Sequence, residues 1–154
     1  MTLAAQDGWR TFGPSHSAAS ISREMLTAHN AVRARVNVPP LAWSDRLAVV
    51  AQQWASRLLR ERQFYHRPHS QFGENLFEIS GARSTPAGVV AGWASEARDF
   101  NYRANTCRGA CGHYTQLVWA STREVGCGVA RLKDREVWVC NYDPPGNWVG
   151  QRPY

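Results

Sequence analysis

The sequence predicts an α+β protein, a layered sandwich in which helices surround a small antiparallel sheet. Three segments carry apolar residues at helical spacing, and one later segment alternates like a β-hairpin. With 154 residues, the chain is long enough to bury the core of one domain. No apolar run approaches the length of a membrane-spanning helix, so we expect a soluble globular protein.

Residues 1–19 are rich in Gly, Ser, Ala and Pro without periodicity, which predicts a flexible N-terminal arm before a domain at 20–154. A first helix is expected from Ser20 to Asn37. A second helix is expected after Ser44, a plausible N-cap, and fades near Arg62. The two apolar stripes are Ile21, Met25, His29 (or Ala28), Val32 and Val36, then Leu47, Val50, Ala51, Trp54 and Leu58.

Residues 63–84 are mixed and turn-rich, and their pattern favours no single conformation. A third helix is expected from Thr85 and Pro86, because threonine caps a helix and proline suits its first turn. Its apolar side carries Val89, Val90, Trp93 and Ala97. Glu96 lies near that side, where it either faces a cleft or pairs with Arg98 or another arginine.

Alternation around residues 125–129 and 137–142 predicts a hairpin. If Lys133 and Asp134 form the turn, Leu132 faces Arg135, and counting outward places Cys127 opposite Cys140. Opposed strand positions are close enough for a disulfide, whose closed loop would be worth roughly 3 kcal/mol.

Four cysteines fit two disulfides and an oxidising compartment, with buried thiols or a zinc site as the alternatives. The spacings of 3, 15 and 12 intervening residues lack the paired C-x2-C knuckles of common zinc modules, so disulfides are favoured. Cys107 and Cys111 would close only a tight loop. The start, Met1 to Gly8, lacks a signal-peptide pattern. Either a leader has been removed or the protein stays inside the cell. The cysteines favour a removed leader, so we expect a secreted or periplasmic protein.

The formal charge of +6, carried by 17 arginines and one lysine, would allow attraction to anionic membranes, cell walls or nucleic acid. The only dense run, at residues 57–67, is interrupted by Glu61 and predicts a solvated helix face. No nucleic-acid-binding motif is present, so we expect no nucleic acid partner.

Five segments in order carry a family resemblance. They are AHNAVR at 28–33, PLAW at 40–43, GENL at 73–76, CGHYTQLVW at 111–119 and CNYDPPGNW at 140–148. On these motifs residues 21–154 resemble the CAP superfamily, the cysteine-rich secretory proteins, antigen 5 and pathogenesis-related protein 1. The resemblance is closest to pathogenesis-related protein 1 and its bacterial relatives.

The resemblance implies an α-β-α sandwich with a central cleft faced by two histidines and two glutamates. Glu74, Glu96 and His113 match three of these residues. His66 fits the spacing of the remaining histidine best, and His69 is the alternative. Plant members usually have six cysteines, and two of those positions, which pair with each other in the family, are Arg62 and Leu132 here. This supports the pairs Cys107–Cys111 and Cys127–Cys140.

Two imidazoles and two carboxylates converging on a pocket suit a divalent cation, with zinc favoured over magnesium by the imidazoles. Such binding would weaken as the histidines protonate near pH 6. The equally supported alternative is that the four groups only hydrogen-bond one another and brace the fold. His29 is expected to be structural, and Asn75 and Gln116 to tie loops together through backbone hydrogen bonds.

The function expected is binding, of a cation and of a sterol, another lipid or a defence-related partner at a membrane or cell-wall surface. Phe100 and Tyr102 would line an apolar pocket, or simply pack. A metal-dependent ester or peptide hydrolase is the alternative. A serine-based hydrolase is not indicated, because no serine lies in a G-x-S-x-G elbow. The tail at 144–154 resembles a peptide that some plant members are proposed to release. The competing interpretation is a strap that packs Trp148 and Tyr154 over the domain.

Overall fold

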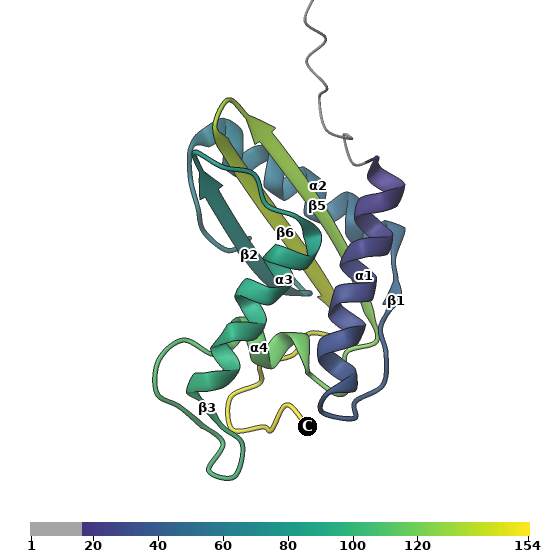
Figure 1. Cartoon of the computed structure of the whole chain (residues 1–154), viewed down its shortest axis with the longest axis vertical. Coiled ribbons are helices and arrows are strands. Elements are labelled where there is room, and N and C mark those ends of the chain that lie inside the picture. The colour runs from purple at the N-terminus through teal and green to yellow at the C-terminus, as the bar shows by residue number, and fades with distance from the viewer. Residues whose placement is uncertain (1–16) are drawn as a thin grey trace, which may run out of the picture.

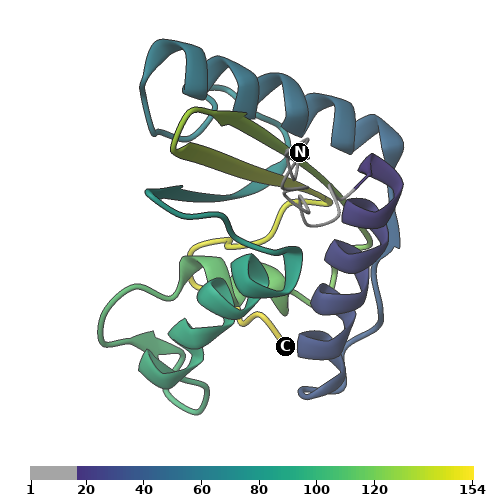
Figure 2. The same ribbon diagram turned by 45° about the horizontal axis from the view of Figure 1, so that its top comes forward.

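In the computed structural model, which describes residues 17–154, a four-stranded sheet lies between helices on both of its faces (Figure 1). Helix α2 (Asp45–Glu61) covers one face, and α1 (Ala18–Ala34), α3 (Pro86–Ala94) and α4 (Gly112–Leu117) lie on the other side (Figure 2). The predicted α+β class and α-β-α sandwich are confirmed. No helix in these residues is both long and apolar enough to span a bilayer.

The first helix begins slightly earlier than its pattern predicts. The side chain of Ser17 accepts a hydrogen bond from the Ser20 N–H at 3.2 Å, so Ser17 is the N-cap and Ala18 and Ala19 are helical. The helix therefore begins two residues before the predicted Ser20, and residues 1–16 of the predicted arm lie outside the described part. The buried face of α1 includes His29 and Arg33 besides its apolar residues.

Helix α2 begins after Ser44, as predicted, and ends at Glu61 with Arg62 as its C-cap, close to the predicted end. It packs closely on the sheet because strand β5 carries glycines at the contact. A Cβ on Gly126 would lie 2.2 Å from the backbone nitrogen of Ala48, and a Cβ on Gly128 would lie 2.4 Å from the Cα of Gln52. The arginines at 57, 60 and 62 are exposed, as expected for a solvated helix face.

The sheet has the order β1-β5-β6-β2, formed by Ala42–Trp43, Glu124–Leu132, Arg135–Asp143 and Gly73–Ser80. The hairpin register is confirmed, because Leu132 pairs with Arg135 and Cys127 with Cys140. A disulfide joins these two cysteines. The sheet is mixed and not purely antiparallel, because the two-residue strand β1 runs parallel to β5.

Strand β2 comes from the segment for which the sequence pattern favoured no conformation. It pairs antiparallel with β6 over all eight residues, from Gly73 opposite Tyr142 to Ser80 opposite Arg135. Glu74 and Glu78 interrupt the alternation of apolar residues that would predict a strand from the sequence. This edge strand carries the first acidic residue of the candidate site.

Helix α3 starts at Pro86 with Thr85 as its cap, as predicted. It continues as the 3₁₀ helix η1 (Ser95–Asp99), whose tighter winding leaves Ala97 exposed instead of on the apolar side. A small ribbon of β3 (Phe100–Asn101) and β4 (Thr106–Cys107) then leads to α4. The predicted disulfide Cys107–Cys111 closes the loop immediately before α4.

The C-terminal segment is held against α4 and the loop after it. The Ala120 N–H donates to the carbonyl of Pro153 at 2.7 Å, and the hydroxyls of Tyr114 and Tyr154 are hydrogen-bonded at 3.2 Å. Tyr154 packs against the core as expected for a strap, but Trp148 remains 55% exposed and does not pack over the domain. The bond between Asp143 and Pro144, where the segment starts, is cis.

Candidate histidine-glutamate site

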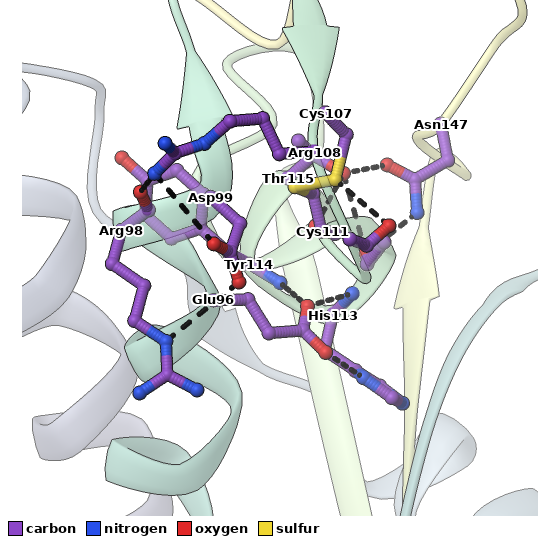
Figure 3. The surroundings of a disulfide bond; sticks show 12 residues. Glu96, Arg98, Asp99, Cys107, Arg108, Cys111, His113, Tyr114, Thr115 and Asn147 are labelled. Carbon is purple, nitrogen blue, oxygen red and sulfur yellow. Dashed lines mark hydrogen bonds and ion pairs between the residues drawn. A yellow bond between two sulfur atoms is a disulfide. The ribbon is translucent and has the colours of Figure 1, made fainter.

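Glu96 and His113 form one pair at the start of α4 (Figure 3). One oxygen of Glu96 contacts the Nδ1 of His113 at 2.7 Å. The other oxygen accepts the backbone N–H groups of His113 and Tyr114, at 2.9 and 3.1 Å. Glu96 therefore bonds with α4 and not with Arg98, which lies 3.7 Å from Asp99 instead.

His66 and Glu74 form a second pair at the beginning of β2. The Nδ1 of His66 lies 2.8 Å from a Glu74 oxygen, which also accepts the Arg67 N–H at 3.0 Å. The carboxylate is nearly buried, whereas the His66 side chain is 64% exposed. His69 makes no hydrogen bond to either glutamate among the described residues, so His66 is the histidine that contacts the Glu74 carboxylate.

Asn75 connects the two pairs. It follows Glu74 in β2, and its side-chain amide donates to the carbonyl of His113 at 3.1 Å. The same amide donates to the Tyr142 hydroxyl at 3.2 Å. The expectation that Asn75 ties loops through backbone groups is confirmed. Gln116 does the same where it accepts the Gly146 N–H at 3.0 Å.

The four predicted residues thus meet as two hydrogen-bonded pairs. Within residues 17–154, no three of them place one ligand atom each within 4.8 Å of one another. Because both histidines use Nδ1 for their glutamate, both Nε2 atoms remain available. The hydrogen bond to Glu74 raises the pKa of His66 above its ordinary value, while partial burial works in the opposite direction.

A different group of three potential ligands lies in the core. The ligand atoms of His29, Cys127 and Cys140 lie within 4.8 Å of one another. However, the two sulfurs are bonded to each other as a disulfide, and a metal-binding cysteine must be a free thiolate. Both ring nitrogens of His29 are also engaged, with the Met25 carbonyl at 2.7 Å and the Tyr142 hydroxyl at 2.9 Å. His29 is therefore structural, as predicted.

Sequence reasoning missed one polar atom beside the site. The Oδ1 of Asn141 is the only buried side-chain nitrogen or oxygen among the described residues without a hydrogen-bond partner. Asn141 lies opposite Glu74 in the sheet, and its amide nitrogen is 3.5 Å from that carboxylate. Only the strand pairing, which the sequence did not predict for β2, could have indicated this neighbour.

The two aromatic residues predicted to bind lipid occupy different surroundings. Phe100 packs against Tyr114, with ring centroids 6.0 Å apart, and lines a groove of about 370 Å³ beside the first disulfide. Tyr102 stacks on Tyr154 at 4.7 Å and also lies under the guanidinium of Arg152. Tyr102 is not among the residues that line this groove.

Glu96 also braces the fold, which gives a measurable consequence. We expect Glu96→Gln to lower the free energy of unfolding by about 1–2 kcal/mol, because an amide oxygen cannot replace a carboxylate that accepts three hydrogen bonds. Urea denaturation of both proteins measures this. Glu124→Gln is the control, because Glu124 is a surface residue whose ion pair with Arg46 spans 3.8 Å, so its loss should be nearly neutral. Equal losses in the two variants would contradict the bracing role.

Comparisons with known proteins agree with this fold and arrangement. Residues 26–142 match the cysteine-rich secretory protein family, abbreviated CAP. The chain belongs to this family. Pathogenesis-related protein 1A of Nicotiana tabacum is 43% identical over 145 residues, covering 91% of this chain and 86% of the relative. The relatives of this chain thus include pathogenesis-related proteins of plants.

Solved structures show the same architecture. Schistosoma mansoni venom allergen-like protein 4 is 29% identical with a TM-score of 0.71, covering 86% of this chain and 92% of that chain. NaASP2, solved in a crystal structure with Zn²⁺, has a TM-score of 0.72 at 21% identity, covering 92% of this chain and 88% of that chain. At that identity the likeness is one of fold alone.

Proposed function

We propose that this protein is a secreted, defence-type CAP protein that binds a divalent cation, preferentially zinc, at the two histidine-glutamate pairs. One observation carries the proposal. Each histidine bonds its glutamate through Nδ1, which leaves Nε2 as an available ligand atom. A carboxylate that holds the opposite nitrogen fixes the tautomer and orientation of a metal-binding imidazole.

The chemistry of the donor set favours zinc. Imidazole nitrogens suit zinc better than magnesium, which prefers oxygen ligands and keeps much of its water. The exposed position of His66 and the half-buried position of His113 leave both rings within reach of a hydrated ion. Because no three of the four residues place ligand atoms within 4.8 Å of one another in the described part of the chain, an ion held by the two histidines would complete its coordination with water. NaASP2 in its structure with Zn²⁺ is a precedent for the ion within the fold.

Zinc titration by calorimetry tests the proposal. We expect wild type to bind one zinc ion, and His66→Ala and His113→Ala each to weaken binding by about 100-fold or more, since even outer-shell partners cost 10–100-fold. Magnesium should bind far more weakly than zinc.

His69→Asn is the matched control, because His69 is an exposed histidine three residues from His66 in the same loop. Asparagine tolerates its left-handed backbone at φ 55°. This variant should bind zinc like wild type. Equal heats of zinc binding for wild type and His113→Ala would reject the proposed site. A loss of zinc binding confined to His69→Asn would place the site at His69 instead.

Extracellular location is part of the proposal. The two disulfides, with no free cysteine in the described residues, are consistent with an oxidising compartment. Sterol or lipid binding at Phe100 and Tyr102 remains a prediction from the family resemblance, as do attraction to a membrane or cell-wall surface and peptide release from the tail.

A further inference from the structure

The groove of about 370 Å³ beside the first disulfide lies between two segments that are far apart in the sequence. Residues 100–119 bound it on one side, and residues 147–153 of the C-terminal segment bound it on the other. The Asn147 side chain links the two sides (Figure 3). It accepts from the Thr115 hydroxyl at 2.6 Å and donates to the Gly112 carbonyl at 2.8 Å. We call this feature the disulfide groove, and the cross-link makes it a preformed site.

The disulfide groove is lined, within residues 17–154, by no charged side chain, although 19% of the residues of the chain are charged. Two arginines adjoin the lining in sequence, but both bond elsewhere. Arg108 donates to the carbonyl of Arg98 at 3.1 Å, and Arg152 donates to the carbonyls of Tyr102 and Arg103. An ionic ligand would lose water in this groove without gaining a partner of opposite charge. The lining therefore selects a neutral ligand.

Polar groups of the lining remain free to bond with such a ligand. The side chains of Thr106 and Gln151 are exposed and make no hydrogen bond to another residue in 17–154. Asn105 donates its amide nitrogen to the Gln151 carbonyl at 3.3 Å, and its Oδ1 has no partner in the same range. Hydroxyl and carboxamide groups together both donate and accept hydrogen bonds, as the hydroxyls of a sugar do. These groups therefore match a neutral ligand that carries many hydroxyls.

Trp148 adds a flat apolar surface to the disulfide groove. Its side chain is 55% exposed, although its Nε1 donates to the Pro145 carbonyl at 3.0 Å. The Trp148 carbonyl accepts the Gln151 N–H, also at 3.0 Å. The two bonds hold the indole in place, so little side-chain freedom is lost when a ligand stacks on it. A glucose-configured pyranose ring suits this surface, because its C–H groups lie on its faces and its equatorial hydroxyls lie around its edge.

We propose that the disulfide groove binds a neutral oligosaccharide built of glucose-configured pyranose rings. One ring stacks on Trp148, and its hydroxyls bond with Gln151, Thr106 and the Oδ1 of Asn105. The volume of the groove falls within the roughly 300–1,000 Å³ of small-molecule sites. Neither the net positive charge of the chain nor a bound cation contributes to this recognition, so the site is independent of the two histidine-glutamate pairs.

Calorimetric titration with cellotetraose, in the presence of EDTA, tests the proposal. We expect saturable binding of one cellotetraose with the same affinity at about 0.05 and 0.5 M sodium chloride, because salt screens charges but not stacking or neutral hydrogen bonds. Its carboxylated counterpart, β-1,4-tetraglucuronate, should bind only through the charged surface and lose affinity as salt is added.

Variants of the disulfide groove locate the sugar. Trp148→Ala should weaken cellotetraose binding at least about tenfold, because the buried apolar contact is lost, and Trp148→Phe should recover most of the affinity. Gln151→Leu should weaken it about fivefold, the usual effect of one lost hydrogen bond. Val149→Ala is the matched control and should bind like wild type, because Val149 is completely exposed and lies outside the lining.

Nuclear magnetic resonance of the tryptophan indole N–H groups gives a readout on the wild-type protein. Cellotetraose should shift the Trp148 signal, which is identified by its absence in Trp148→Ala, and leave that of Trp43 unchanged, because Trp43 lines a different cavity. The proposal is overturned by a lack of saturable cellotetraose binding, by equal affinity of Trp148→Ala and wild type, or by an equal loss in Val149→Ala. A shift of Trp43 without one of Trp148, or tetraglucuronate binding that depends on Trp148, would also overturn it.

Discussion

Replacing Arg33 by methionine is expected to lower the free energy of unfolding by about 4 kcal/mol or more. The guanidinium is completely buried. Its Nε donates to the carbonyl of Pro39 at 2.7 Å, and one terminal nitrogen donates to the carbonyls of Leu117 and Trp119, both at 2.9 Å. The other terminal nitrogen reaches Thr122 at 3.2 Å. Each buried carbonyl left without a donor costs about 1–3 kcal/mol.

The size of this effect follows from the nature of the partners. All four acceptors are backbone carbonyls, in the loop after α1 and in the connection from α4 to β5, so no second substitution can remove them. Burial lowers the pKa of Arg33 to about 10, which still leaves it charged at neutral pH. The arginine thus ties three segments together and also sets the position of α4, which carries His113.

Guanidinium chloride denaturation measures the loss, with Arg35→Met as the matched control. Arg35 lies two residues further along the chain and is exposed, so its replacement should change stability by less than about 0.5 kcal/mol. Arg33→Lys should fall between the two, because an ammonium keeps the charge but cannot span four carbonyls. This variant keeps the prediction testable if Arg33→Met does not fold. Equal stability of Arg33→Lys and wild type would show that the carbonyl network contributes little.

The sequence predicts the hairpin in full because its geometry is local. A two-residue turn at Lys133 and Asp134 fixes the pairing of every residue outward, including Cys127 with Cys140. The starts of α2 and α3 are predicted for the same reason, since Ser44 and Thr85 each cap the backbone three residues ahead. Turns and helix caps involve residues only a few positions apart, so they can be predicted without knowledge of the tertiary structure.

Other features depend on contacts between distant segments and were not predictable. Strand β2 is a strand because β6 lies beside it, although its own polar residues obscure the alternation. Arg33 stands four residues after His29, on the buried face of α1, and that position was the available signal for an interior cation. Three of its four partners lie more than 80 residues away in sequence, so its role could not be deduced.

The candidate site was predicted as residues but not as an arrangement. The family motifs supplied Glu74, Glu96 and His113, and spacing favoured His66 over His69. That each glutamate holds the Nδ1 of one histidine, and that Asn75 joins the pairs, depends on the meeting of β2 with α4. Whether these groups form one cation site is a matter for the zinc titration.

Acidification from pH 6.5 to 4 is expected to remove about 3 kcal/mol of stability through His29 alone. Burial lowers the pKa of this histidine from 6.5 to about 4, and the nearby charge of Arg33 adds to the shift, while the hydrogen bond to Met25 opposes it. His29 therefore becomes protonated near pH 6.5 in the unfolded chain, but only near pH 4 in the folded chain. The stability is fully present above pH 6.5, and it is lost as the pH falls through this window at up to 1.4 kcal/mol per pH unit.

The hydrogen bonds around His29 explain why protonation of this ring is unfavourable in the folded state. The Met25 carbonyl can only accept, so Nδ1 carries the hydrogen, and Nε2 accepts from the Tyr142 hydroxyl. The oxygen of that hydroxyl already accepts from Asn75. Protonating Nε2 would direct a second donor at the same oxygen and leave the tyrosine hydrogen without this acceptor. Burial also raises the pKa of Tyr142, so the tyrosine cannot provide a compensating negative charge.

Urea denaturation of wild type and His29→Gln between pH 7 and pH 4.5 isolates this effect. Glutamine has no titrating group, so the variant should be less stable at pH 7 yet lose less stability on acidification. Carboxylates such as Glu136 titrate in both proteins, and their contribution cancels in the difference between the two slopes.

His66→Gln is the opposing control. The pKa of His66 is raised, so the stability that its protonation contributes is present at low pH and lost as the pH rises. Removing it should steepen the acid loss, whereas removing His29 should flatten it. Parallel curves for wild type and His29→Gln would mean that the folded protein accommodates a protonated His29 as readily as water does.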